Sequence, residues 1–192
     1  MEAFLVSLSS VAIAEIGDRT QLLSLVLAAH YRKPWPILAG VLLATLANHA
    51  AAGLLGQWFA FVLTPPIADL LVGASMLAMA IWTLRPDTLE AMPRLGRRGA
   101  FLATLIAFFI AEIGDKTQIA TAALAAACSG LTQVVLGTTL GMLIANAPVV
   151  FLGKAFADRL PLRRIHQAAA LLFLALGAWF LIRALTGAAE PR

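Results

Sequence analysis

The chain has 192 residues, of which 61% are hydrophobic and 12% are charged, and its formal net charge is +4. A single globule of this size cannot bury so many apolar side chains, and the mean hydropathy of +0.89 excludes a water-soluble domain. The one cysteine, Cys128, excludes a disulfide framework and any redox relay that needs two thiols. The sequence therefore predicts an integral membrane protein.

Six apolar stretches follow one another along the chain, each long enough to cross about 30 Å of hydrocarbon as a helix. They are too long, and too apolar on all sides, to be β-barrel strands. Proline or glycine separates each stretch from the next. We expect an all-α membrane protein with one transmembrane domain over 1–192 and six helices near 4–30, 37–63, 67–84, 100–128, 132–157 and 167–186.

The basic residues gather on alternate connections between these helices. The connections after the second and fourth helices carry no Lys or Arg, whereas those after the first, third and fifth do. By the positive-inside rule, the odd-numbered connections are cytoplasmic and both termini face outward. The lipid bilayer thus accounts for the positive charge, with no nucleic acid as a partner. The residues concerned are Arg32, Lys33, Arg85, Arg94, Arg97, Arg98, Lys154, Arg159, Arg163 and Arg164.

The two halves of the sequence match each other at an offset of 97 residues. Between 13–29 and 110–126, 11 of 17 positions are identical. Each half holds three predicted helices, an odd number, so the second copy enters the membrane from the opposite side. This predicts a 3+3 inverted-topology repeat, which is typical of alternating-access transporters with a site near the midplane. Repeat 1 covers about 1–86 and repeat 2 about 98–186, linked by a cytoplasmic loop at 87–97.

Ionisable residues lie inside two of the apolar stretches, in the octets AEIGDRTQ at 14–21 and AEIGDKTQ at 111–118. On continuous helices, the two acids and the amide of each octet share a face. Gly17 and Gly114 permit close helix approach, or local unwinding that frees backbone carbonyls as further ligands. We expect one metal site built from both octets by Glu15, Asp18, Gln21, Glu112, Asp115 and Gln118.

Charge limits what this site can bind. Four carboxylates in a low dielectric repel one another and need cations or protons. Arg19 and Lys116 lie four residues after the glutamates of their octets, within reach on a helix, and reduce the formal charge from −4 to −2. One divalent cation or two protons satisfy that charge, which predicts metal/proton exchange. Salt bridges from Glu15 to Arg19 and from Glu112 to Lys116 that only fix helix packing are the structural alternative.

Other polar residues could support the site. We expect the two threonine hydroxyls of the octets to bond backbone carbonyls rather than substrate. The serine and threonine beyond the acids could line the route out, or bond their own helix. The asparagines and histidine of the second and fifth helices could be gate residues or simple interhelical hydrogen-bond partners. These residues are Thr20, Thr117, Ser24, Thr121, Asn48, His49 and Asn146.

E-x-G-D-[KR]-[ST], present once in each half of a small six-helix chain, resembles the signature of a divalent-cation transporter family within the lysine-exporter superfamily. That family includes Golgi manganese and calcium/proton transporters, chloroplast manganese transporters and bacterial manganese exporters. The resemblance covers the whole chain. It implies that the metal-binding acids are Glu15, Asp18, Glu112 and Asp115. It also implies manganese(II) export from a prokaryotic cytoplasm across the inner membrane, coupled to protons.

Alternative functions differ in the ion or in the chemistry. Carboxylate, amide and carbonyl oxygens suit Mg²⁺, Ca²⁺ or Mn²⁺, and their spacing does not choose among them, so a calcium/proton antiporter is the first alternative. An intramembrane metalloenzyme is disfavoured, because two identical inverted motifs suit a site visited from both sides. We therefore expect a transporter and not an enzyme, with no cofactor and with Mn²⁺ or Ca²⁺ as the transported ion. The sequence leaves the oligomeric state open.

Overall fold

The computed structural model describes residues 1–85, 99–128, 130–153 and 160–186, and its regular elements there are all α-helices. The expected loop at 87–97 lies outside the described residues, as do Arg94, Arg97, Arg98, Lys154 and Arg159 among the expected cytoplasmic cations. In chain order the helices are α1 (Glu2–Glu15), α2 (Arg19–Tyr31), α3 (Pro34–Val62), α4 (Pro65–Thr83), α5 (Ala100–Glu112), α6 (Lys116–Ala127), α7 (Leu131–Leu152) and α9 (Leu162–Thr186).

Four of these helices, α3, α4, α7 and α9, are long and apolar enough to cross a membrane by themselves. The other four are shorter and come as the consecutive pairs α1–α2 and α5–α6, each in place of one expected long helix. α3 and α4 begin at Pro34 and Pro65, earlier than expected, because the first turn of a helix accommodates proline. The chain is an all-helical, multi-pass membrane protein.

The expected continuous helices at 4–30 and 100–128 are wrong, because each breaks inside its octet. α1 ends at Glu15 and α5 at Glu112. The chain then passes through Gly17 at φ 85° and Gly114 at φ 74°, a region that glycine adopts without a Cβ clash. The next helix starts after an aspartate in both cases. Local unwinding at the glycines, the other outcome that the sequence allowed, is what the structure has.

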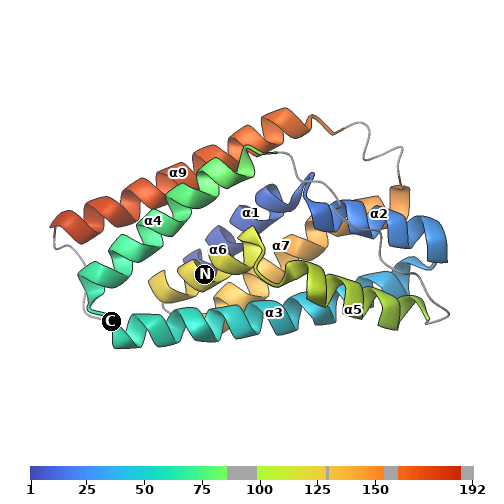
Figure 1. Cartoon of the computed structure of the whole chain (residues 1–192), viewed down its shortest axis with the longest axis horizontal. Coiled ribbons are helices and arrows are strands. Elements are labelled where there is room, and N and C mark those ends of the chain that lie inside the picture. Colours follow the sequence, from blue (N-terminus) through green and yellow to red (C-terminus); the bar gives the residue numbers. More distant parts are fainter. Residues whose placement is uncertain (86–98, 129, 154–159, 187–192) are drawn as a thin grey trace.

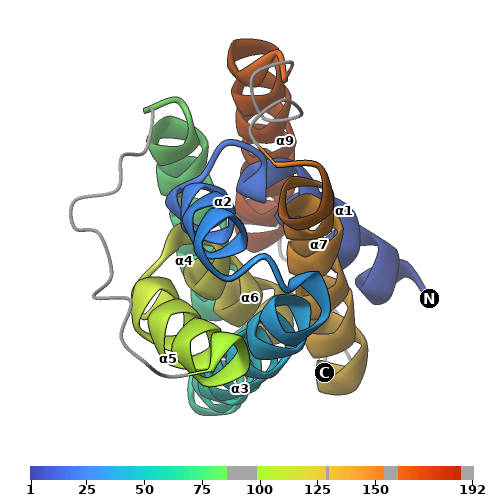
Figure 2. The same cartoon turned by 90° about the vertical axis from the view of Figure 1, so that its right-hand side faces the viewer.

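The helices pack so that each broken pair lies against a long helix from the other half of the sequence. α1 packs along α7 and α5 along α3, as Figure 2 shows from one end of the molecule. α4 and α9 run side by side along one flank (Figure 1). The octets, which lie at the breaks, are therefore enclosed by helices of both halves.

Two equivalent glycines let these helices approach closely. A Cβ on Gly40 of α3 would lie 2.9 Å from the Phe101 carbonyl oxygen of α5, and a Cβ on Gly137 of α7 would lie 2.5 Å from the Phe4 carbonyl oxygen of α1. Gly40 with Gly137, and Phe4 with Phe101, are related by the same 97-residue offset. Small residues at such contacts are typical of membrane helix packing. The two halves thus use matching contacts to hold their broken helices.

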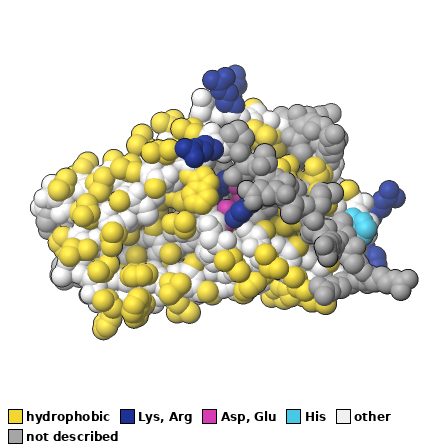
Figure 3. Space-filling model, in the orientation of Figure 1, with side chains coloured by type: hydrophobic (Ala, Val, Ile, Leu, Met, Phe, Trp, Pro, Cys, Tyr) yellow, Lys and Arg dark blue, Asp and Glu magenta, His cyan; other side chains and the backbone are white. Residues whose placement is uncertain are grey.

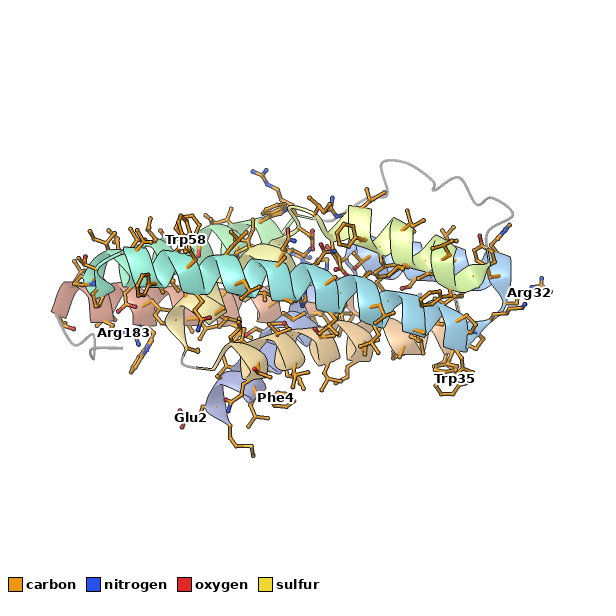
Figure 4. The ribbon with its side chains drawn as sticks, turned by 90° about the horizontal axis from the view of Figure 1, so that it is seen from below. Glu2, Phe4, Arg32, Trp35, Trp58 and Arg183 are labelled. Carbon is orange, nitrogen blue, oxygen red and sulfur yellow. The ribbon has the colours of Figure 1, made fainter. Side chains whose placement is uncertain are left out.

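The outer surface carries many large apolar side chains, as expected for a surface that faces lipid (Figure 3). Trp58 and Trp35 project from opposite ends of α3, and Arg32 lies at the same end as Trp35 (Figure 4). Polar side chains are instead concentrated inside, around the two helix breaks. Apolar side chains thus face outward and polar side chains face the interior, so the candidate site is internal.

Candidate metal centre

Three carboxylates from the two octets converge at the helix breaks. Glu15, Asp18 and Asp115 each offer an oxygen, and these oxygens all lie within 4.8 Å of one another. The three side chains are buried, with at most 2% of their surface exposed. Glu15 ends α1, whereas the two aspartates are the N-caps of α2 and α6. A helix N-terminus favours negative charge, so each break places its aspartate where a carboxylate is stabilised.

Glu15 is the acid whose surroundings most strongly favour a bound cation. Both of its carboxylate oxygens are fully buried, and neither has a hydrogen-bond partner among the described residues. An ionised carboxylate without a partner is costly in a low-dielectric interior, so this group requires a cation or a proton. The two neighbouring aspartates supply further oxygens for a cation at the same place.

The cation of each octet pairs with the aspartate of the other. Arg19 Nη2 lies 3.0 Å from an Asp115 carboxylate oxygen, and the Lys116 ammonium donates to Asp18. The structural alternative, in which each cation pairs with the glutamate of its own octet, is not what the described residues show. It assumed a continuous helix, and the break between glutamate and cation removes the i, i+4 relationship. The two crossed pairs instead join the octets to each other.

Glu112 lies apart from the three clustered carboxylates. Its carboxylate accepts hydrogen bonds from the Thr45 hydroxyl and from Asn48 Nδ2, at 3.1 Å, both on α3. Asn48 Nδ2 also lies 3.1 Å from the Phe109 carbonyl oxygen. The structure therefore brings together three of the four acids expected at the site and holds the fourth against α3.

The two glutamines brace the breaks. The Oε1 of Gln21 accepts from the Gly17 N–H at 2.9 Å, and the Oε1 of Gln118 accepts from the Gly114 N–H at 2.7 Å. Gln21 also donates through Nε2 to the Ala145 carbonyl oxygen of α7, at 2.9 Å. Both amide oxygens, which we expected to bind the ion, instead accept a hydrogen bond from the backbone N–H of the glycine at the helix break.

The octet threonines differ from each other. The Thr117 hydroxyl donates to the Asp115 carboxylate at 3.1 Å, so the expectation that it bonds a backbone carbonyl is wrong. The buried Thr20 hydroxyl has no hydrogen-bond partner among the described residues. Thr117 therefore helps to fix one of the clustered acids.

The remaining supporting residues follow both of the expected patterns. Ser24 donates to Asn146 Oδ1 at 2.7 Å and so bridges α2 and α7, whereas Thr121 bonds the Thr117 carbonyl of its own helix at 2.7 Å. Asn146 also donates to the Met142 carbonyl oxygen at 3.0 Å. Both ring nitrogens of His49 are buried without a partner in the part of the chain that is described.

The two breaks differ in what covers them. His166 Nε2 of α9 lies 3.2 Å from the Ile16 carbonyl oxygen, and a Cβ on Gly17 would lie 2.8 Å from both His166 and Leu162. A Cβ on Gly114 would meet no atom of the described residues within 4 Å. Figure 3 shows acidic and basic side-chain atoms near the middle of one face, beside residues that are not described.

Sequence reasoning missed three structural partners. Thr45 gave no signal except its position three residues before Asn48. His166 lies near the start of α9, outside the octets, and no local sequence pattern relates it to the break at Gly17. The ion pair between buried Asp69 of α4 and Arg183 of α9 involves residues outside the repeated octet, and Figure 4 shows Arg183 toward one end of the molecule.

The chain was compared with known proteins. The family described as "Divalent cation/proton antiporter GDT1" matches it twice, over residues 3–91 and again over 100–188. The "Putative manganese exporter" of Vibrio cholerae serotype O1 (strain ATCC 39541 / Classical Ogawa 395 / O395) is 54% identical over 175 residues, which cover 91% of this chain and 88% of that protein.

A second relative, "GDT1-like protein sll0615" of Synechocystis sp. (strain ATCC 27184 / PCC 6803 / Kazusa), is 29% identical over 194 residues, covering 90% of this chain and 93% of the relative. No solved structure matches the chain. Both octets, the buried acids and the apolar helices agree with the family's description. The chain belongs to the GDT1 family of divalent cation/proton antiporters and is a membrane transporter of divalent cations.

Proposed function

We propose that this protein exports manganese(II) from the cytoplasm in exchange for protons, and that Glu15, Asp18 and Asp115 bind the ion. The observation that carries the proposal is the buried Glu15 carboxylate, which has no hydrogen-bond partner in the described part of the chain and lies beside two other carboxylates. Intramembrane acids of this kind mark ion pathways by default.

The donor chemistry favours a hard divalent ion. Carboxylate oxygens suit Mn²⁺, Ca²⁺ and Mg²⁺, and the cluster contains no thiolate. We assign the ion to the carboxylates because the oxygens of Gln21 and Gln118 already accept backbone hydrogen bonds. The name of the Vibrio cholerae relative supports manganese over the others. A calcium/proton antiporter using the same acids is the second candidate, because the same oxygen donors suit Ca²⁺.

Proton exchange follows from charge balance. The three clustered acids and the two cations beside them leave a formal charge of −1, and Glu112 on α3 brings the octets to −2, which one divalent ion or two protons neutralise. The crossed pairs keep Arg19 and Lys116 beside the clustered aspartates, so the compensating charges stay at the site. Protons and metal then compete for the same carboxylate oxygens, and binding one displaces the other.

For the architecture, we propose a six-span 3+3 inverted repeat in one transporter domain over 1–192. The supporting observations are the double family match, the matching breaks after Glu15 and Glu112, and the equivalent glycine contacts of α3 and α7. Repeat 1 covers about 1–86 and repeat 2 about 98–186, joined by the loop at 87–97. The basic connections favour the inner membrane with both termini outside.

Metal flux into proteoliposomes tests this function. Purified protein should carry Mn²⁺ faster than Mg²⁺ and Zn²⁺, and an opposing proton gradient should accelerate it. Faster Ca²⁺ than Mn²⁺ flux under the same gradient would assign calcium as the ion. Flux of no divalent ion above that of empty liposomes would overturn the proposal, and flux indifferent to the gradient would overturn proton exchange.

A further inference from the structure

Glu15 and Glu112 occupy equivalent positions in the two octets but lie in different surroundings. Glu15 faces two aspartates and has no hydrogen-bond donor among the described residues. Glu112, equally buried, accepts from Thr45 and Asn48 of α3. The Glu112 carboxylate therefore has hydrogen-bond donors, whereas the Glu15 carboxylate has none among the described residues.

The sequence explains why Glu112 has hydrogen-bond donors beside it and Glu15 does not. At the 97-residue offset, Thr45 corresponds to Met142 and Asn48 corresponds to Ala145. Methionine and alanine side chains have no hydrogen-bond donor, so α7 cannot hold Glu15 as α3 holds Glu112. The two octets differ from each other only at Arg19 and Lys116, so these two positions on α3 and α7 account for the different surroundings of the glutamates.

The contact also ties Glu112 to the end of α5. Asn48 reaches both the Glu112 carboxylate and the Phe109 carbonyl oxygen, each at 3.1 Å, so one amide group fixes the side chain and the last turn of the helix. Moving Glu112 toward the clustered acids therefore breaks its hydrogen bonds with Thr45 and Asn48.

We propose that Thr45 and Asn48 are positioning residues that hold Glu112 out of the ion cluster, so that Glu15 binds the ion in this state and Glu112 does not. The inference rests on the proposed function of the cluster as the ion site. The two glutamates then have different roles. Glu15 binds the ion, and Glu112 can bind it only after its hydrogen bonds with α3 are broken.

The first arm of the test compares Glu15→Gln with Glu112→Gln. Mn²⁺ binding to the purified full-length protein is measured by isothermal titration calorimetry in detergent, alongside transport in proteoliposomes. Glu15→Gln should weaken binding by about 10- to 100-fold or more, as the loss of a group at a metal site does. Glu112→Gln should weaken Mn²⁺ binding by less than about threefold, because Glu112 does not contribute its charge to the ion in this state. Transport should fall in both variants.

The second arm removes the hydroxyl that holds Glu112. Thr45→Val should lower the Mn²⁺ Kd by about threefold and slow turnover, because the released Glu112 adds ligand charge and retards ion release. Thr45→Ser keeps a hydroxyl and should restore both values. Thr138→Val is the matched control, since that buried hydroxyl bonds only the Val135 carbonyl of its own helix. If Thr45→Val does not fold, Asn48→Ala takes its place.

The outcomes separate the two proposals. Equal losses of binding in Glu15→Gln and Glu112→Gln would overturn the proposal that only Glu15 binds the ion in this state. The proposed function of the cluster as an ion site would stand. The same conclusion follows if Thr45→Val, or Asn48→Ala in its place, weakens binding or behaves like Thr138→Val. If the wild type binds no Mn²⁺, or if Glu15→Gln binds it normally, the proposed function itself fails.

Discussion

Lys116 of the second octet forms an ion pair with Asp18 of the first octet, 98 residues earlier in the chain. The reciprocal pair joins Arg19 to Asp115. Because both cations reach across to the other octet, neither half can complete its own charge balance. The two motifs therefore act as one structural unit, which accounts for their duplication.

Removing the buried cation should destabilise the protein. Lys116 is 2% exposed, so Lys116→Met leaves the buried Asp18 without its cation and should cost about 3–5 kcal/mol of unfolding free energy. Arg19→Met is the matched change in a side chain that is 35% exposed, and it should cost less because water screens that pair. Thermal unfolding in detergent measures both. Equal losses of stability in the two variants would contradict the claim that burial makes the Lys116–Asp18 pair the more important one.

Metal binding should weaken as the pH falls. Protons and Mn²⁺ compete for Glu15, Asp18 and Asp115, so acidification fills the carboxylates with protons and lowers metal affinity. Titration calorimetry at a series of pH values between roughly 5 and 8 would detect this competition. Thermal unfolding at each pH confirms that the fold persists. An affinity that stays flat over that span would rule out proton competition.

The two octet glycines should respond differently to alanine. Both have positive φ, and forcing alanine there costs about 1–2 kcal/mol. Gly17→Ala adds a clash with His166 and Leu162, whereas a Cβ on Gly114 meets no described atom within 4 Å. Gly17→Ala should therefore lower the unfolding temperature more than Gly114→Ala, and Gly114→Asn should recover stability because asparagine tolerates this backbone conformation. The reverse order would show that the break at Gly17 is not covered as described.

Both termini should face outward. The basic connections assign the odd-numbered loops to the cytoplasm, so a cysteine at position 190 should react with an impermeant thiol reagent in intact cells. A cysteine at position 96 should react only after the membrane is permeabilised. Glu190→Cys and Gly96→Cys are made in a Cys128→Ala background, which itself serves as the unlabelled control. Labelling at 96 but not at 190 in intact cells would reverse the topology.

The sequence was sufficient for the general plan of the molecule. Hydropathy located the apolar segments, and the offset of 97 residues located both octets and their acids. The octets were informative because ionisable residues are costly inside a membrane and therefore stand out from the apolar residues around them. The convergence of Glu15, Asp18 and Asp115 follows from that signal.

Tertiary contacts were not predictable in the same way. The helical spacing of Glu15 and Arg19 predicted a local pair, but the positive φ of Gly17 ended the helix between them. A Gly–Asp sequence is compatible with a continuous or a broken helix, and the packing of the surrounding helices determines which of the two forms. Thr45 is an ordinary threonine until α3 packs against α5, so its bond to Glu112 could not be read from local pattern.

The central claim is that both octets build one ion site, and a double-variant comparison tests it most directly. Mn²⁺ transport is measured in proteoliposomes for Asp18→Asn, Asp115→Asn and the double variant, with the amount of folded protein equalised. Each single variant should lose about 10-fold or more, and the double variant should lose far less than the product of the two losses, because residues of one site are not additive. Single variants that each retain roughly half of the wild-type transport, with the remaining transport lost in the double variant, would show two independent sites and contradict the account.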